Sequence, residues 1–146
     1  TELNDSTGET LRRTGVEFGS TTGRPRRCGW LDLVALKYSV MINGINQIAL
    51  TKLDVLDEHE EIKVCTEYNV NGKIIKNFPA DLPSITNAVP VYKTVKGWHK
   101  PLRGTGAWNK LPQEALDYFK IIEDYVGAEI RIVSLSPDRA DTLVKY

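Results

Sequence analysis

The sequence predicts a mixed α/β fold in which helices flank a sheet. Apolar residues recur at helical spacing in two stretches, 30–44 and 111–126, and a short apolar run typical of a buried strand follows each stretch. Between these helix–strand pairs, an alternating stretch at 62–70 leads into Asn71-Gly72, a strong short-range signal for an antiparallel hairpin. Together these observations favour a mixed α/β sheet with flanking helices.

The first helix–strand pair is expected over residues 30–50. Its helix carries one apolar stripe and ends near Gly44; the stripe consists of Trp30, Leu33, Val34, Leu36, Val40 and Met41. Residues 45–50 then form a short buried strand, and the polar segment Thr51-Lys52-Leu53-Asp54 lies at its carboxyl end. A charged loop follows at residues 57–61.

The middle of the chain is expected to hold a hairpin and a long irregular stretch. Alternation along 62–70 indicates a half-buried strand with one wet face. Asn71-Gly72 accepts left-handed backbone and turns the chain into a second strand over 74–78. Residues 79–112 hold five of the seven prolines, so we expect mostly loop there, with room for a short strand around 91–95.

The second helix–strand pair lies towards the end of the chain. Helical spacing returns at 111–126, with Pro112 in the first turn and Gly127 after the last. Residues 130–133 form another buried strand, closed by the polar segment 134–139. The whole chain has 146 residues, 41% hydrophobic and 26% charged, which suits one compact globular unit.

Charge and cysteine content narrow the class of protein. Because 19 basic residues balance 19 acidic ones, no global field attracts nucleic acid or an anionic membrane, and the apolar runs are too short to cross a bilayer. Cys28 and Cys65 are too few for a disulfide scaffold and lack partners at metal-ligand spacing, which favours a reduced, cytoplasmic setting. His59 and His99 stand in no catalytic pattern, so we assign no catalytic residue and no metal ligand.

The first 27 residues form a polar arm with few apolar groups. Such a stretch cannot build a core alone, and the chain opens at Thr1 without an initiator methionine, so we expect a piece of a longer protein. The arm ends in Thr21-Thr22-Gly23-Arg24-Pro25-Arg26-Arg27, whose guanidinium groups and hydroxyls can clamp carboxylates or phosphates. A solvated basic loop and a weak nucleic-acid contact are the alternatives.

Two further polar segments each follow a strand, where open α/β sheets bind ligands. The carboxylate of Asp54 can accept two hydrogen bonds from the N1 and N2 edge of guanine, a pattern that adenine does not offer, while the stem of Lys52 lies along the purine. A polar strand-to-loop junction is the alternative. In Ser134-Leu135-Ser136, backbone amides can approach a nucleobase oxygen, although an ordinary turn has the same composition.

Several segments, in order across essentially the whole chain, match those of a known family. They are Thr1-Glu2-Leu3, 19–32, 50–57, 62–65, Gly97-Trp98 and 136–139. The chain thus resembles the C-terminal third of the adenylosuccinate synthetase family, which implies the C-terminal part of that family's P-loop-NTPase-like fold. The resemblance also implies an enzyme that joins IMP to L-aspartate, with GTP as co-substrate and Mg²⁺ as cofactor. In that reaction the γ-phosphoryl group passes to the 6-oxygen of IMP, and the aspartate amine then displaces phosphate.

The resemblance implies roles for the polar segments. The residues implied in binding aspartate and IMP are Ser20, Thr21, Thr22, Gly23, Arg24, Pro25 and Arg26. The residues implied in binding GTP are Arg26, Lys52, Leu53, Asp54, Ser134, Leu135 and Ser136. Many family members carry glycine where this chain has Ser136, so a close backbone approach is not expected there, whereas Ser134 can still serve.

The resemblance also implies a division of labour. Residues 1–29 carry the aspartate and IMP loop, and residues 30–146 the guanine-recognition region. The sequence lacks a Gly-rich phosphate loop and any counterpart of the family's catalytic Asp and His, which lie with the Mg²⁺ ligands near the family's N-terminus, so we expect this chain alone to be inactive. The full-length protein is expected to be a cytoplasmic homodimer. Two alternatives are a non-catalytic nucleotide- or anion-binding module that works as it stands, and RNA binding through 24–27, which the balanced charge disfavours.

Overall fold

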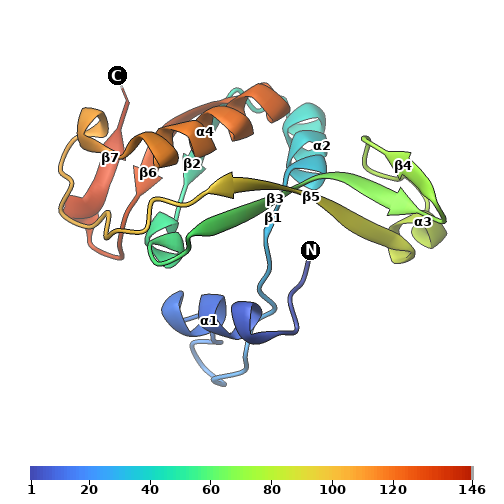
Figure 1. Cartoon of the computed structure of the whole chain (residues 1–146), viewed down its shortest axis with the longest axis horizontal. Coiled ribbons are helices and arrows are strands. Elements are labelled where there is room, and N and C mark those ends of the chain that lie inside the picture. Colours follow the sequence, from blue (N-terminus) through green and yellow to red (C-terminus); the bar gives the residue numbers. More distant parts are fainter. Residues whose placement is uncertain (146) are drawn as a thin grey trace.

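Within residues 1–145, the strands form two sheets, each with parallel and antiparallel pairs (Figure 1). The computed structural model describes residues 1–145; Tyr146, the last residue of the expected guanine-recognition region, lies outside the described residues. The expected mixed α/β class with flanking helices is confirmed, and its strands are divided between two sheets instead of one.

The first sheet is built around the long strand β3 (Glu61–Val70). Strand β5 (Ala88–Lys96) pairs antiparallel with one edge of β3 along its whole length. The other edge is shared by β1 (Leu31–Asp32), which runs parallel to β3, and β4 (Lys73–Ile75), which runs antiparallel. The Asn71-Gly72 turn expected between β3 and β4 is confirmed, since both residues adopt positive φ, 52° and 86°.

The second sheet has β6 (Glu129–Ser134) at its centre. Strand β2 (Gln47–Leu50) pairs parallel with β6, and β7 (Thr142–Val144) pairs antiparallel on the other side. Because β2 and β6 are parallel, the segments that follow them leave the sheet at the same edge. This relationship brings together the two polar segments that sequence analysis singled out.

Two long helices pack with the sheets around the core. Helix α2 (Leu33–Asn43) begins where Asp32 Oδ1 accepts a 3.0 Å hydrogen bond from Ala35 N, and ends at Gly44 with left-handed φ of 61°. It therefore starts later than expected, because residues 31–32 pair with β3 instead. Helix α4 (Gln113–Val126) follows Pro112 and ends at Gly127, as expected. The side chains buried most fully in the core include Leu33, Ile62, Val64, Leu102, Ile122, Ile130, Val133 and Leu135.

The expectation of mostly loop over 79–112 is wrong for its first half. Besides the nine-residue strand β5, this stretch holds the short helix α3 (Leu82–Thr86) and the 3-10 turn η2 (Trp108–Lys110). Pro90 lies within β5, which is tolerated because β5 is an edge strand and one of its sides makes no ladder bonds. Pairing with β3, a long-range contact, outweighs the local proline signal.

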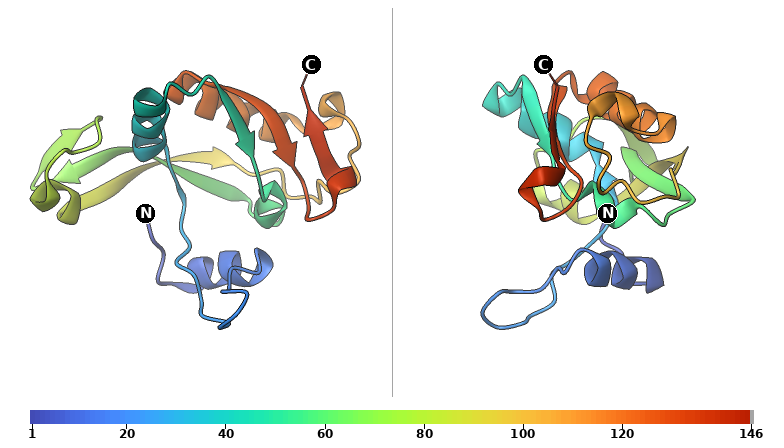
Figure 2. Two further views of the ribbon diagram at one scale, coloured as in Figure 1. Left: turned by 180° about the vertical axis from the view of Figure 1, so that it is seen from behind. Right: turned by 90° about the vertical axis from the view of Figure 1, so that its left-hand side faces the viewer.

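The polar arm also contains a helix that the sequence analysis missed, α1 (Ser6–Thr14). Asp5 Oδ1 accepts a 3.0 Å hydrogen bond from Gly8 N at its start, and Leu11 is its buried apolar contact. Helix α1 lies apart from the two sheets and approaches them at the 3-10 turn η1 (Leu53–Leu56) (Figures 1 and 2). Within residues 1–145, no helix combines the length and apolar content that crossing a bilayer requires.

Candidate functional site

The segment after β2 is shaped by an unusual backbone conformation. Lys52 has left-handed φ of 59°, which turns the chain directly into η1. In η1 the Leu53 side chain is 2% exposed and anchors the turn in the core, while Asp54 remains half-buried. The backbone strain at a non-glycine residue thus falls on one of the predicted ligand-binding positions, where such strain tends to concentrate.

The segment after β6 is held by its own hydrogen bonds. Ser134 Oγ donates to the backbone oxygen of Ser136 (2.9 Å), and Ser136 Oγ donates to Asp141 Oδ2 (2.6 Å). Asp141 belongs to the 3-10 turn η3 (Arg139–Asp141), and its backbone oxygen accepts from Leu135 N at 3.0 Å. Leu135 is fully buried, so its side chain fixes the loop to the core.

These two segments line one pocket of about 280 Å³. The end of α1 closes its third side. The lining residues are Thr14, Gly15, Val16, Thr51, Lys52, Asp54, Val55, Ser134, Ser136 and Pro137. We call this the base pocket, after the nucleobase contacts that sequence analysis expects of its polar residues. Sequence analysis placed Lys52, Asp54 and the two serines after strands, and the parallel pairing of β2 with β6 brings them to one place. Leu53 and Leu135 point into the core, so only their backbone atoms are available to a ligand.

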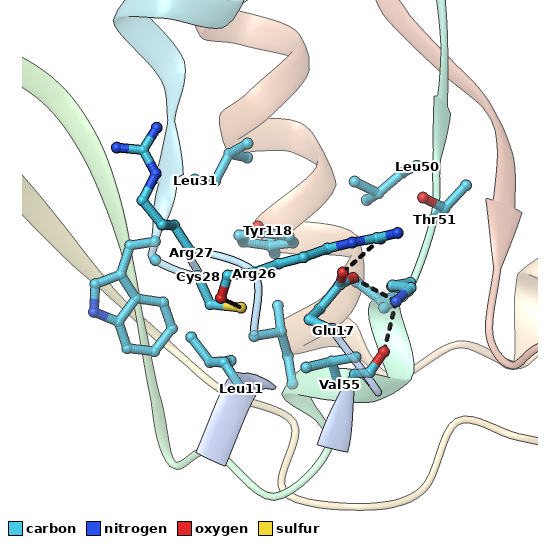
Figure 3. A pocket seen from close by; sticks show the side chains of 16 residues that line it. Leu11, Glu17, Arg26, Arg27, Cys28, Leu31, Leu50, Thr51, Val55 and Tyr118 are labelled. Carbon is cyan, nitrogen blue, oxygen red and sulfur yellow. Dashed lines mark hydrogen bonds and ion pairs between the residues drawn. The ribbon is translucent and has the colours of Figure 1, made fainter. Parts of the chain in front are cut away.

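A carboxylate from the arm joins two cations beside this pocket (Figure 3). Arg26 Nη1 donates to Glu17 Oε2 at 3.0 Å, and Lys52 Nζ donates to Glu17 Oε1 and to the backbone oxygen of Gly15, the latter at 2.6 Å. The hydrogen bond from Lys52 is the main cause that lowers the pKa of Glu17 below its usual value, and Arg26 adds to the effect. Glu17 is therefore ionised at neutral pH.

A second, larger pocket of about 430 Å³ separates the arm from the body of the protein (Figure 3). Its wall is mostly apolar and includes Leu11 of α1, Leu50 of β2 and Tyr118 of α4. Its charged lining residues are Glu17, Arg26, Arg27 and Lys52. Lys52 borders both pockets, so the ion pairs stand at their junction.

The remaining predicted substrate residues lie on a projecting loop. Residues 20–25 are exposed, and the loop extends away from both sheets (Figure 2). It is closed by hydrogen bonds from Gly19 N to Arg24 O and from Gly23 N to Gly19 O, each 2.8 Å. Ser20, Thr21, Thr22, Gly23, Arg24 and Pro25 therefore do not reach the base pocket, whereas Arg26 is turned back towards Glu17.

Almost the whole length of the chain matches one protein family. The family model described as adenylosuccinate synthetase matches residues 1–143. The chain belongs to the adenylosuccinate synthetase family.

Individual members of this family are similar over almost the whole chain. The adenylosuccinate synthetase of Aquifex aeolicus is 53% identical over 139 residues, which cover 95% of this chain and 32% of that protein. That of Cytophaga hutchinsonii is 51% identical over 146 residues, 99% of this chain and 34% of that protein. The structure of fully ligated adenylosuccinate synthetase from Plasmodium falciparum superposes with a TM-score of 0.93 at 38% identity, over 100% of this chain and 35% of that one. The chain thus spans about a third of the length of these relatives.

The Mg²⁺ that the adenylosuccinate synthetase family implies finds no ligand set in the part of the chain that the structure describes. Among residues 1–145, no group of three or more His, Cys, Asp or Glu side chains is arranged to hold a metal ion. We therefore assign Mg²⁺ no role among these residues.

Several residues at or beside the site escaped sequence analysis. Glu17 and Asp141 each hold a predicted ligand-binding residue, yet nothing in their local sequence marks them, because their partners come from other segments. His59 lies in the charged loop expected at residues 57–61, but it is half-buried and packs edge-on against Trp30, with ring centroids 5.5 Å apart. Burial raises the pKa of Cys65 to about 11, in line with the absence of a nucleophilic role for this thiol.

Proposed function

We propose that this chain is the part of an adenylosuccinate synthetase that reads the guanine base of GTP and binds L-aspartate and the IMP ribose. In the complete enzyme the reaction joins IMP and L-aspartate to give adenylosuccinate, GDP and phosphate. The observation that carries the proposal is the base pocket, in which Lys52 and Asp54 meet the loop of Ser134 and Ser136 at one edge of the second sheet.

Guanine recognition follows from the hydrogen-bonding groups of this pocket. The two oxygens of Asp54 accept from the N1 and N2 donors of guanine, and adenine lacks this pair of donors. The Leu135 N–H already donates to the backbone oxygen of Asp141. Because a close backbone approach is not expected at Ser136, we assign contact with the guanine oxygen to Ser134. Lys52 covers the purine with its alkyl stem.

Aspartate and ribose recognition is assigned to the projecting loop. Thr21, Thr22 and Arg24 offer hydroxyls and a guanidinium group, which suit a small dicarboxylic substrate, and Arg24 also faces the ribose. Fixing both carboxylates of aspartate leaves its amine as the oriented nucleophile for displacement of the phosphate. The remaining residues of this assignment are Ser20, Gly23, Pro25 and Arg26.

Two functional parts follow from these assignments. We propose that residues 1–29 act as the substrate-binding arm and residues 30–146 as the base-reading region. Phosphoryl transfer needs positioned donors and a metal around the transferred group, and we assign neither to this chain. The 146 residues by themselves are therefore proposed to be inactive, and the active protein is proposed to be a cytoplasmic homodimer, as the family resemblance implies.

The test uses a full-length hybrid, in which residues 1–146 stand in place of the matching third of the Aquifex aeolicus relative. The hybrid is expected to form adenylosuccinate from IMP, aspartate and GTP. Asp54→Asn replaces one acceptor oxygen with an amide donor. The affinity of the hybrid for GTP should therefore fall about tenfold to a hundredfold, as expected for loss of a charged hydrogen bond. Its affinity for IMP should stay nearly unchanged. Asp124→Asn, on the exposed side of α4, is the matched control. Full preference for GTP over ATP in the Asp54→Asn hybrid contradicts base reading by Asp54.

A stand-alone binding module is the second candidate, because every residue of the base pocket belongs to this chain. Calorimetry on the 146-residue chain with GTP and with IMP separates the two readings. Micromolar affinity together with an inactive hybrid favours the module. Steeply salt-dependent binding of an oligonucleotide would favour RNA binding instead.

A further inference from the structure

We propose that Glu17 is a positioning residue that holds Arg26 and Lys52 in a fixed relation, so that the substrate-binding arm and the base pocket act as one unit. This inference rests on the proposed function, in which Arg26 and Lys52 contact ligands. It adds a residue that the family resemblance does not assign and that touches no ligand itself.

The first support is the geometry of the carboxylate. Each oxygen of Glu17 accepts from a different cation, Oε2 from Arg26 and Oε1 from Lys52. The Glu17 side chain is 23% exposed, whereas those of Arg26 and Lys52 are 59% and 50% exposed. Glu17 is thus the least exposed of these three residues, and the long side chains of Arg26 and Lys52 both donate hydrogen bonds to it.

The second support is that the backbone around Glu17 is itself fixed. Glu17 N donates to Arg12 O at 2.8 Å, and Glu17 O accepts from Arg26 N at 3.0 Å. Arg12 Nε also donates to Arg26 O at 2.8 Å. Val16 has left-handed φ of 51°, a strained conformation for a β-branched residue, and this turn directs Gly15 O towards Lys52. The hydrogen bonds after the end of α1 therefore hold the Glu17 backbone in place.

The third support is that the cations keep free donors. An ammonium group has three N–H donors and a guanidinium group has five, so the bonds to Glu17 and Gly15 leave at least one donor on Lys52 and several on Arg26 for a ligand. Two cations with one carboxylate between them also retain a net positive charge, which favours anionic ligands. Glu17 borders the larger pocket but not the base pocket, so it acts on ligands through its partners.

An isolated ion pair on a protein surface contributes little, and Glu17 would then be dispensable. Glu17 differs from such an isolated pair because it binds two cations, Arg26 and Lys52. These come from separate segments, and both are proposed ligand-binding residues. Glu17→Gln keeps the shape of the side chain but leaves a single acceptor oxygen, and its amide group cannot accept from the second cation. Both the arm and the base pocket should be disturbed by this one change.

The test measures KM for GTP and for aspartate in the full-length hybrid. Glu17→Gln is expected to raise both KM values by about threefold to tenfold, in the range for a partly exposed charged hydrogen bond, while kcat changes little. Glu17→Asp keeps the charge and should recover part of the loss. Glu114→Gln is the matched control, because Glu114 is 29% exposed and pairs with Lys96 at 2.9 Å outside both pockets. The control should leave both KM values unchanged.

The following results overturn the inference. Unchanged KM values in Glu17→Gln, or a change in only one of them, show that Glu17 does not join the two parts. Lower KM values for both ligands show that Glu17 competes with them for Arg26 and Lys52. A hybrid that is inactive, or whose GTP preference survives Asp54→Asn, refutes the proposed function and this inference with it. An active hybrid that responds to Asp54→Asn but not to Glu17→Gln refutes the inference alone.

Discussion

The Ser136 hydroxyl donates a 2.6 Å hydrogen bond to Oδ2 of Asp141, five residues along the chain. The same carboxylate accepts from Gly104 N through Oδ1 at 3.0 Å and lies 3.4 Å from Arg103 Nε. One nearly buried carboxylate thus joins the loop after β6 to the loop before α4. Ser136 is not among the residues with left-handed backbone, so the chain conformation itself does not require glycine at this position.

Ser136→Ala removes the main cause that lowers the pKa of Asp141. A carboxyl group whose pKa is lower in the folded state contributes stability above its unfolded value of 3.8, and this stability is lost as the pH falls through the folded value. In Ser136→Ala the folded pKa shifts up towards 3.8, so this carboxylate contributes less stability and the free energy of unfolding should decrease less as the pH is lowered. Urea unfolding between pH about 7 and about 3 measures this shift. If the free energy of unfolding falls by the same amount at low pH in Ser136→Ala and in the unmodified chain, the Ser136 hydroxyl does not lower the pKa of Asp141.

The same substitution should loosen the loop that borders the base pocket. Because the loop then samples more conformations, GTP binding by the full-length hybrid is expected to weaken by a factor of about three to ten, the range for the net contribution of one ordinary hydrogen bond. Binding of IMP should change much less. Equal weakening of both ligands would indicate general destabilisation instead of a local effect.

His59 provides a second pH-dependent contribution. Burial against Trp30 is the main cause that lowers its pKa below 6.5, and the nearby Glu58 opposes the shift. Above pH 6.5 both the folded and the unfolded state hold neutral histidine, so stability is complete. As the pH falls below this value, the unfolded state binds a proton first, and the free energy of unfolding decreases until the folded pKa is reached.

His59→Phe keeps an aromatic ring beside Trp30 but cannot titrate. The free energy of unfolding of this variant should therefore change less between pH about 7 and about 5 than that of the unmodified chain. Substitution of the exposed His99 by phenylalanine serves as the control for the change of side chain. If the free energy of unfolding of His59→Phe depends on pH as strongly as that of the unmodified chain, another group is responsible for this dependence.

Sequence analysis succeeded where the signals are local. The positions of α4 and of the turn at Asn71-Gly72 follow from helical spacing and from residues that accept left-handed backbone, and both are confirmed. Strands β1 and β7 escaped it because each has only a few residues and is defined by its partner. Strand β5 was underestimated for the same reason, since its length is set by pairing with β3.

The residues of the candidate site also divide into those that local sequence predicts and those that it does not. Lys52, Asp54 and Ser134 could be predicted because each follows a strand, and parallel pairing then places them at one edge. Glu17 and Asp141 could not, because their roles depend on the folded positions of Lys52 and Ser136. Local sequence thus indicates residues that come to line one pocket, whereas the groups that hold them in place emerge only from the tertiary structure.

The docking of α1 depends on Leu11, the buried apolar side chain of the arm. Leu11 is 6% exposed and borders the larger pocket with Val55 and Tyr118 (Figure 3). Because that pocket already leaves space beside it, Leu11→Ala should reduce stability by about 2 kcal/mol, the low end for a buried leucine. The loss should fall on the arm, since Leu11 lies outside the core clusters of the two sheets.

Hydrogen exchange followed by mass spectrometry distinguishes local from global loss. In Leu11→Ala, the amides of α1 should exchange faster while those of β3 keep their protection. Leu82→Ala is the matched control, because Leu82 is 73% exposed, and it should change stability by less than about 0.5 kcal/mol. If α1 and β3 lose protection together, the arm is an integral part of the core. If neither changes, the ion pairs of Glu17 are sufficient to hold α1 without the apolar contact.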